Sequence, residues 1–368
     1  MKTIAFYISD YGMGHASRSI ALIRKILSAD LNVRFFVKTY GPFEFVRKSL
    51  QDPRVRVLRC RNDPDIILQP GTSQVDGEKT YAAFSAWMDR WDEYIRNETE
   101  FCREHSVTGI ISDITPQPFL VAHALGISGI AVSNFTWLSV YRELFGDSPS
   151  VERIQNAYLM ASVAFVLPFS FGMDLFPVRI EIPLLARRVT VSRQDMRKKF
   201  KIPESDTVIY LGLGRIFDLS VDHYRNLPQR NGVTFLLPLG VPVPARMKVM
   251  TIPEEETESQ NWLNMCDLIV TKCGYSSISE AVQSHIPLLV WKREGYIEDE
   301  ILGKDIVSLG IGKVLPFDEI VAFSWLDDIP IIRESIENFD IMGGLYQNTG
   351  AEAIVPHITR VLYHDVLE

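Results

Sequence analysis

The stretch TIAFYISDYGMGHASRSIALIRKILSADLNVRFFVK, residues 3–38, decides the fold class. Its first seven residues form an apolar run that predicts a buried strand, and a loop with two glycines follows. Ile20, Ile23 and Leu27 then recur at helical spacing before a second β-rich run at residues 32–38. This order predicts a strand, a crossover helix and a parallel second strand, which is the repeating unit of an α/β fold.

The same alternation continues along the chain. Further β-rich runs lie at residues 54–60, 109–113, 128–134, 163–169, 207–214, 232–240, 246–253, 267–274 and 286–292. A charged, proline-bearing segment from about Pro183 to Ser205 is typical of a linker. We therefore expect two Rossmann-like, doubly wound domains facing a cleft, at residues 1–185 and 200–340, followed by a terminal helix within residues 345–368.

The composition limits the function classes. The 368 residues are 46% hydrophobic and 23% charged, which is typical of a globular protein. A formal net charge of −8 without a basic cluster argues against a nucleic-acid partner. The four cysteines show no CxxC spacing, and no apolar run reaches the ~18 residues of a membrane span. These features predict a cytoplasmic protein and leave peripheral membrane contact and oligomeric state open.

One histidine and one aspartate follow predicted strands of the first domain. Ligands of open α/β sheets bind at the carboxyl ends of the strands, where His15 and Asp113 both lie. A carboxylate that orients an imidazole makes it a general base, so this pair is a candidate catalytic dyad. The alternative is that the two side chains cap helices beginning near Ala16 and Gln117.

The segment DLIVTKCGYSSISEA, residues 267–281, predicts an anion site in the second domain. A buried strand ends at Gly274, and the N-terminus of a helix there would direct backbone N–H groups at a phosphate or pyrophosphate. The hydroxyl groups of Ser276 and Ser277 add donors. Glu280 is a candidate ligand contact, although Ser277 and Glu280 also have the spacing of a capping box.

Two weaker signals accompany these motifs. A second turn with Gly212, Gly214 and Arg215 follows the first strand of the second domain, and it is either a phosphate contact or an ordinary tight turn. Asp63 and Asp65 have a DxD spacing but follow a first-domain strand, so we expect no metal site there.

Aromatic and basic side chains raise two further questions. Phe135 and Trp137 follow a first-domain strand and are either a sugar-stacking surface or core. Lys292 and Arg293 follow a second-domain strand and are either phosphate contacts or solvated charges at the edge of the sheet.

Longer segments carry a resemblance to a known family. The segment CDLIVTKCGYSSISEAVQSHIPLLVWKREGYIEDEILGKDIVSLGIGKVL, residues 266–315, resembles the donor-binding signature of GT-B glycosyltransferases of the murein and UDP-glucuronosyltransferase type. Residues 7–26 and 111–141 resemble the glycosyltransferase-like N-terminal region of L-arabinokinase. The resemblance implies two Rossmann-like domains, with the acceptor bound by the first and a nucleotide-sugar by the second. It also implies that the terminal helix returns to the first domain.

The resemblance implies roles for the first-domain motif. His15 corresponds to the family's catalytic base and Asp113 to its orienting carboxylate, while Gly12 and Gly14 lie in the acceptor loop. The first loop has fewer glycines than the murein enzymes carry.

In the second domain, Gly274, Ser276 and Ser277 correspond to the diphosphate-binding turn, and Glu280 to the acid that holds the ribose. The chain departs from the pattern here, because residues 272–275, Lys-Cys-Gly-Tyr, replace the histidine-bearing version of the signature. The Asp-Gln pair that binds the donor sugar in the family is also absent, which leaves Glu298 as the candidate sugar contact.

The function that the resemblance implies is inverting transfer of a sugar from a nucleotide-sugar, UDP-linked, to an unknown acceptor hydroxyl. No metal and no cofactor besides this co-substrate is expected. A nucleotide-sugar epimerase is an alternative, since it shares the architecture. A second alternative is a non-catalytic module that binds a nucleotide-sugar.

Overall fold

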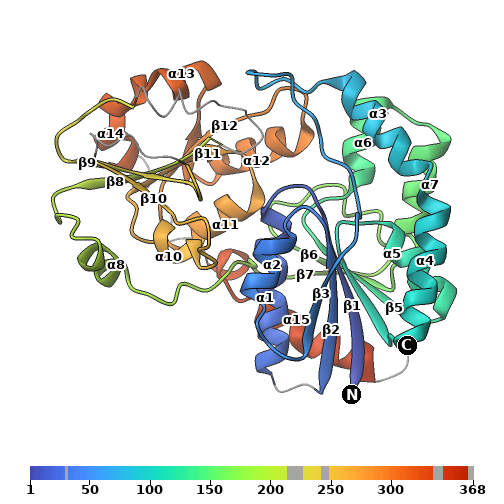
Figure 1. Cartoon of the computed structure of the whole chain (residues 1–368). Coiled ribbons are helices and arrows are strands. Elements are labelled where there is room, and N and C mark those ends of the chain that lie inside the picture. The colour runs from blue at the N-terminus through green and yellow to red at the C-terminus, as the bar shows by residue number, and fades with distance from the viewer. Residues whose placement is uncertain (30–31, 214–226, 242–247, 335–342, 364–368) are drawn as a thin grey trace. The chain divides into compact units, whose positions relative to one another are not determined.

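The computed structural model describes residues 1–29, 32–213, 227–241, 248–334 and 343–363 (Figure 1). The chain forms two compact units. Unit 1 contains Met1–Ile67, Asp76–Ala186 and Gly344–Glu368, and unit 2 contains Leu68–Val75 and Arg187–Gly343. Each unit is an α/β layer structure around one parallel sheet, so the predicted fold class is confirmed.

Unit 1 has a seven-stranded sheet with the order β3-β2-β1-β4-β5-β6-β7. Its strands are β1 (Lys2–Ile8), β2 (Val33–Thr39), β3 (Val55–Arg59), β4 (Gly109–Asp113), β5 (Ser128–Ser133), β6 (Val163–Val166) and β7 (Arg179–Glu181). All neighbours pair in parallel. The strand order reverses between β1 and β4, and a reversal of this kind is where open α/β sheets bind ligands.

The central strands of unit 1 are apolar on both faces. Ile4 and Ala5, which point to opposite faces of β1, are fully buried, as are Ile110 and Ile111 in β4. Strands covered by helices on both faces require such continuous apolar runs, which explains why the sequence pattern located them.

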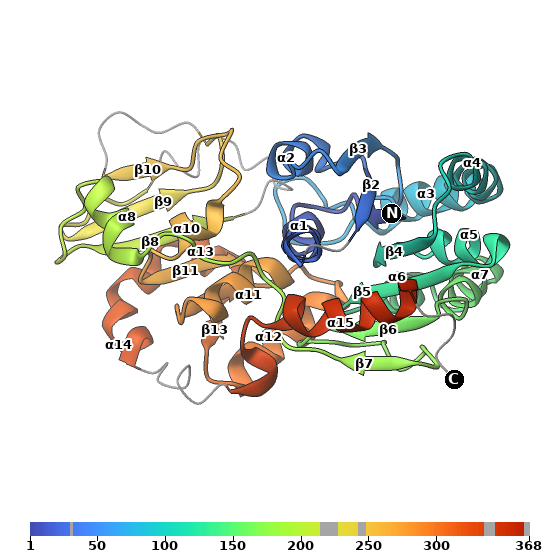
Figure 2. The same ribbon diagram turned by 90° about the horizontal axis from the view of Figure 1, so that it is seen from below.

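Two groups of helices cover this sheet (Figure 2). The helices α1, α2 and α15 lie on one face, and α4, α5 and α7 lie on the other. The helices of unit 1 are α1 (Gly14–Ser28), α2 (Phe43–Ser49), α3 (Gly77–Met88), α4 (Trp91–Glu104), α5 (Gln117–Leu125), α6 (Trp137–Phe145), α7 (Pro149–Tyr158) and α15 (Gly350–Tyr363). The terminal helix α15 packs on α1, where Lys25 Nζ lies 3.0 Å from Glu352 Oε1.

Unit 2 repeats the arrangement with a six-stranded parallel sheet, in the order β10-β9-β8-β11-β12-β13. Its strands are β8 (Thr207–Gly212), β9 (Val233–Leu237), β10 (Val249–Thr251), β11 (Leu268–Lys272), β12 (Leu288–Trp291) and β13 (Gly312–Val314). Its strand order reverses between β8 and β11, so the second candidate site also lies at a reversal point.

Within the described residues, the helices of unit 2 are shorter on average than those of unit 1. They are α8 (Arg193–Lys199), α10 (Ser259–Leu263), α11 (Tyr275–Gln283), α12 (Ile297–Ser308), α13 (Phe317–Ala322) and α14 (Ile329–Glu334). The helix α11 directly follows β11, and α12 follows β12, so both begin at the edge of the sheet where the strands end.

The structure places residues 187–199 in unit 2, ahead of the expected start at residue 200. The reason is a pair of arginines in α8. Arg193 and Arg197 both donate to the carboxylate of Asp267, and Arg197 Nη2 lies 2.5 Å from its Oδ2. The charged segment that resembles a linker therefore contains a helix that packs on the second sheet.

A segment from the first half of the sequence also belongs to unit 2. Leu68 and Val75 form an antiparallel bridge, and Gln74 pairs in parallel with Glu294. Ser73 Oγ and Gln74 Nε2 each donate to the Glu294 carboxylate over 3.1 Å. These contacts with Glu294 explain why residues 68–75, although they come from the first half of the sequence, belong to unit 2.

Candidate functional site

The loop between β1 and α1 presents His15 at the carboxyl end of β1. Gly12 has φ +74°, a left-handed conformation that side chains with a Cβ rarely adopt. The helix then begins at Gly14, with Met13 as its N-cap and no capping side chain. His15 is therefore the second residue of α1, and its buried side chain points to the sheet rather than to its own helix end.

The structure brings His15 and Asp113 together. Ile8 lies opposite Asp113 in the β1–β4 register, so the end of β4 stands beside the start of the loop that carries His15. The His15 Nδ1 atom lies 2.9 Å from Asp113 Oδ1. Among the described residues the other ring nitrogen, Nε2, makes no hydrogen bond.

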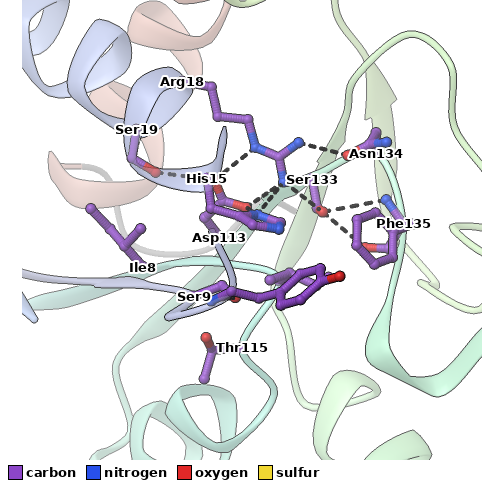
Figure 3. A network of polar contacts seen from close by, with 12 residues as sticks. Ile8, Ser9, His15, Arg18, Ser19, Asp113, Thr115, Ser133, Asn134 and Phe135 are labelled. Carbon is purple, nitrogen blue, oxygen red and sulfur yellow. Dashed lines mark hydrogen bonds and ion pairs between the residues drawn. The ribbon is translucent and has the colours of Figure 1, made fainter. Parts of the chain in front are cut away.

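An arginine that sequence reasoning missed completes this cluster (Figure 3). Arg18 binds Asp113 through a two-point fork, with Nε 2.7 Å from Oδ2 and Nη2 2.5 Å from Oδ1. The same Nη2 atom lies 2.8 Å from His15 Nδ1. Arg18 follows His15 by three positions, so helical spacing alone would have placed both on one face of α1.

Neutral polar side chains make further hydrogen bonds to Arg18 and Asp113. Arg18 Nη1 donates to Asn134 Oδ1 over 2.6 Å, and Nη2 donates to Ser133 Oγ over 3.3 Å. Ser19 Oγ donates to Asp113 Oδ2 over 3.0 Å. Figure 3 shows these groups converging from α1, from the end of β4 and from the end of β5.

Asp113 is ionised at neutral pH. Burial is the largest influence on its pKa and raises it, because only 1% of the residue is exposed. The positive charges of Arg18 and His15, together with their hydrogen bonds, outweigh burial and lower the pKa from 3.8 to about 2.

The capping alternatives are wrong. His15 does not cap α1, since Met13 occupies the N-cap. Asp113 does not cap α5, whose N-cap is Pro116 and carries no side-chain hydrogen bond. Both side chains are instead committed to the cluster around Arg18.

The DxD aspartate Asp63 has a different environment. Ser9 Oγ and the Asp10 backbone N–H donate to its Oδ1 over 3.0 and 2.8 Å, and Thr115 Oγ1 and Trp137 Nε1 donate to its Oδ2 over 3.1 and 2.9 Å. Burial and the neighbouring Asp10 charge raise the pKa of Asp63 to about 7. Asp63 therefore links three loops at the end of the sheet.

The candidate stacking residues are core residues in this structure. Phe135 is 1% exposed and Trp137 is not exposed. Phe135 stacks on Phe171 at 5.3 Å between ring centroids, and its own centroid lies 5.9 Å from that of His15. Its aromatic face is therefore occupied by protein.

In unit 2, Gly274 is the N-cap of α11 and no side chain caps this helix end. Its φ of −164° is accessible to any residue. A Cβ atom at Gly274 would meet only Lys272 Cε, at 4.0 Å. Neither backbone strain nor packing within the described residues therefore requires glycine at this position.

The side chains after this turn are placed differently from one another. Ser276 and Ser277 are half-buried in the first turn of α11. Glu280 is buried, and its Oε1 accepts from Arg187 Nη2 over 2.8 Å and from Nε over 3.1 Å. The capping-box alternative is wrong, because the helix begins at Tyr275 and Ser277 is inside it.

The second turn is only partly described. Gly212 ends β8 and pairs with Thr271, next to the Gly274 turn. A Cβ atom at Gly212 would meet Tyr210 Cε1 at 2.5 Å, so packing explains this glycine. Gly214 and Arg215 lie outside the described residues.

The two basic residues after β12 differ. Lys292 is half-buried and pairs with exposed Glu300, with Nζ 2.6 Å from Oε2. Arg293 is 1% exposed; its Nε lies 2.9 Å from Asp299 Oδ2 and its Nη2 lies 3.3 Å from Glu298 Oε2. Glu298, the candidate sugar contact, is thus buried beside a cation. Lys272 lies in the same region, where burial is the main cause that lowers its pKa to about 8, with a smaller contribution from Arg293.

Two features are absent from the described residues. These residues contain no group of three or more His, Cys, Asp or Glu side chains arranged to hold a metal ion. Across the same ranges we find no helix with the length and apolar character that crossing a bilayer requires.

Comparison with known proteins identifies the fold. No protein-family model matches the chain. The chain is 24% identical over 315 residues to L-arabinokinase of Arabidopsis thaliana, covering 81% of this chain and 29% of that protein's length. A calicheamicin glycosyltransferase covers 100% of both chains, at 13% identity and a TM-score of 0.68. A UDP-glucose:anthocyanidin 3-O-glucosyltransferase in complex with UDP covers 98% of both chains, at 13% identity and a TM-score of 0.63.

Proposed function

We propose that this chain, which has the GT-B fold of glycosyltransferases, transfers a sugar from a UDP-linked nucleotide-sugar to an acceptor hydroxyl with inversion. The observation that carries the proposal is the state of His15. Its Nδ1 faces an ionised carboxylate, and its Nε2 makes no hydrogen bond in the part of the chain that the structure describes. An imidazole held in this way is suited to accept a proton at Nε2.

The proposed step is a single displacement. His15 Nε2 takes the proton of the acceptor hydroxyl while that oxygen forms a bond to the anomeric carbon. The bond between the anomeric carbon and the phosphate oxygen breaks at the same time, and the nucleoside diphosphate leaves with the electron pair. Asp113 stabilises the positive charge on the ring until the proton passes to solvent.

Unit 2 supports the proposal through the N-terminus of α11. Its backbone N–H groups and helix dipole favour a diphosphate, and the absence of a side chain at Gly274 allows a phosphate to approach the backbone. Half-buried Ser276 and Ser277 can donate further hydrogen bonds. We assign the developing negative charge of the leaving group to these donors, without a metal ion.

Glu280 and Glu298 remain candidate contacts to the ribose and the donor sugar. Arg187 fixes the orientation of Glu280 through Oε1, and Arg293 does the same for Glu298 through Oε2. A carboxylate held in a fixed orientation is a good acceptor for sugar hydroxyls, since less side-chain entropy is lost on binding.

The test begins with binding and proceeds to turnover. UDP and a series of UDP-sugars are added in a thermal-unfolding assay, because a ligand that binds only the folded state raises the melting temperature. UDP release is then measured for each UDP-sugar with a panel of hydroxyl acceptors. We expect His15→Ala to lower the rate by ~10²- to 10⁴-fold with unchanged stabilisation by UDP.

The matched control is His123→Ala, which removes an exposed histidine from α5 of the same unit. Three outcomes would overturn the proposal. These are turnover by His15→Ala at the normal rate, interconversion of intact nucleotide-sugars as in an epimerase, and stabilisation by UDP-sugars with no turnover of any acceptor.

A further inference from the structure

The His15 side chain shares its carboxylate with an arginine. Asp113 Oδ1, His15 Nδ1 and Arg18 Nη2 form a nearly equilateral triangle, with separations of 2.9, 2.5 and 2.8 Å. A guanidinium can only donate hydrogen bonds and stays protonated. These distances alone do not decide whether Nδ1 donates to Asp113 or accepts from Arg18. Proton transfer to Nε2 requires that Nδ1 carries the ring proton and donates a hydrogen bond to Asp113.

The other contacts of Arg18 resolve this choice. Nη2 carries two hydrogens, and two oxygen acceptors are in reach, Asp113 Oδ1 at 2.5 Å and Ser133 Oγ at 3.3 Å. Both hydrogens thus have partners without His15. An unprotonated Nδ1 would instead direct its lone pair at the anionic oxygen 2.9 Å away, which is repulsive.

We propose that Arg18 is the positioning residue of the base: Asp113 holds the single ring proton of His15 on Nδ1, and the fork of Arg18 on Asp113 keeps Nε2 unprotonated, with a free lone pair. The proposal rests on the proposed function for its catalytic meaning. The position of the proton on the ring, however, is a property of the protein alone and can be measured without substrate.

The charge balance supports the same conclusion. Among the described residues, the charged side chains that face the His15 ring are Asp113 from β4 and Arg18 from α1. A further titratable group, Tyr158 of α7, interacts electrostatically with Asp113. The other neighbours, Ser133 and Phe135, are neutral. While Arg18 compensates the buried carboxylate, His15 need not carry a charge.

Without Arg18, this balance changes. Asp113 would then be a buried anion with His15 as its one remaining basic neighbour among the described residues, and a buried charge without a partner is strongly unfavourable. The ring would take up a second proton at Nε2 to form an ion pair. A doubly protonated ring cannot accept the proton of an acceptor hydroxyl.

The experiment measures the proton positions directly by nitrogen-detected NMR of ¹⁵N-histidine-labelled protein, with the His15 signals assigned by their loss in His15→Gln. In the unmodified protein at pH 7.5, we expect a neutral ring with Nδ1 protonated and Nε2 unprotonated. In Arg18→Met we expect both nitrogens to be protonated at this pH. The matched control is Arg24→Met, which removes an arginine of the same helix that donates to the Ser49 carbonyl oxygen over 2.9 Å.

Activity provides a second readout. We expect Arg18→Met to lower the rate at neutral pH by at least about tenfold and to recover part of it as the pH is raised, because a doubly protonated ring regains the lone pair of Nε2 when it loses a proton. A purely structural loss would not recover with pH. Circular dichroism of each variant checks that it is folded.

A second variant keeps the proposal testable if Arg18→Met does not fold. Arg18→Lys retains the charge but cannot span both carboxylate oxygens, so we expect a neutral His15 with a lowered rate. Protonation of Nε2 in the unmodified protein, or unchanged nitrogen signals in folded Arg18→Met, would overturn the proposal. Lack of glycosyl transfer by the unmodified protein would instead refute the proposed function and leave the NMR result intact.

Discussion

The strongest stability prediction concerns Asp113→Asn. The folded protein lowers the pKa of Asp113 from 3.8 to about 2, a difference of about 1.8 units. At 1.36 kcal/mol per unit, ionisation of this group contributes roughly 2 kcal/mol to the free energy of unfolding at neutral pH. The residue is almost fully buried, so solvent screening does not reduce this value appreciably.

The substitution also leaves the Arg18 guanidinium without its anion. Removing one partner of a buried pair costs about 3–5 kcal/mol, and we expect a loss of this size for Asp113→Asn at pH 7. The pKa is depressed in the folded state, so the stabilisation is present above pH 4 and is lost as the pH falls through about 2. The difference between the two proteins should therefore narrow by about 1 kcal/mol at pH 3.

The assay is urea unfolding followed by circular dichroism at pH 7, 5 and 3. Asp147→Asn is the control, because it breaks an exposed contact of 2.9 Å with Arg142 in the same unit, and exposed pairs contribute little. A loss below about 1 kcal/mol for Asp113→Asn at pH 7, or a loss that does not depend on pH, would refute the reasoning.

Two further predictions concern other parts of the chain. Gly274→Ala should leave the melting temperature of the free protein nearly unchanged, because its Cβ has space and its φ is unstrained, yet abolish stabilisation by UDP in the same thermal assay. Loss of stability without any ligand would contradict this. Asp63 should behave oppositely to Asp113, because burial and Asp10 raise its folded pKa to about 7. Its stabilisation is present below pH 4 and lost as the pH rises through 7, so urea unfolding should show wild type losing stability relative to Asp63→Asn between pH 5 and 8. A constant difference over that range would show that Asp63 does not bind a proton in the fold.

The sequence was sufficient for the fold class because buried parallel strands are continuous apolar runs. The strands it missed, β7 (Arg179–Glu181) and β13 (Gly312–Val314), are three residues long and too short to show such a run. The placement of Leu68–Val75 in unit 2 could not be predicted, since it depends on contacts with Glu294, more than 200 positions away. No local pattern carries information of that range.

In the candidate site, too, some residues could be predicted from local sequence and others depend on distant contacts. The positions of His15 and Asp113 followed from one rule, that strand ends of a parallel sheet meet at a common edge. Arg18 was missed although helical spacing places it beside His15, because an arginine in an amphipathic helix is usually solvated. Its burial depends on Asn134 and Ser133, which reach it from another strand.

Asp63 and Asp113 show why position alone does not identify a functional carboxylate. Both are buried side chains at the end of the same sheet, and burial raises the pKa of each. Asp113 faces an arginine and stays charged, whereas Asp63 faces a second carboxylate and four hydrogen-bond donors. An acid that must orient a histidine and stabilise its positive charge has to be ionised at neutral pH, and the neighbouring cation decides which of the two meets that condition.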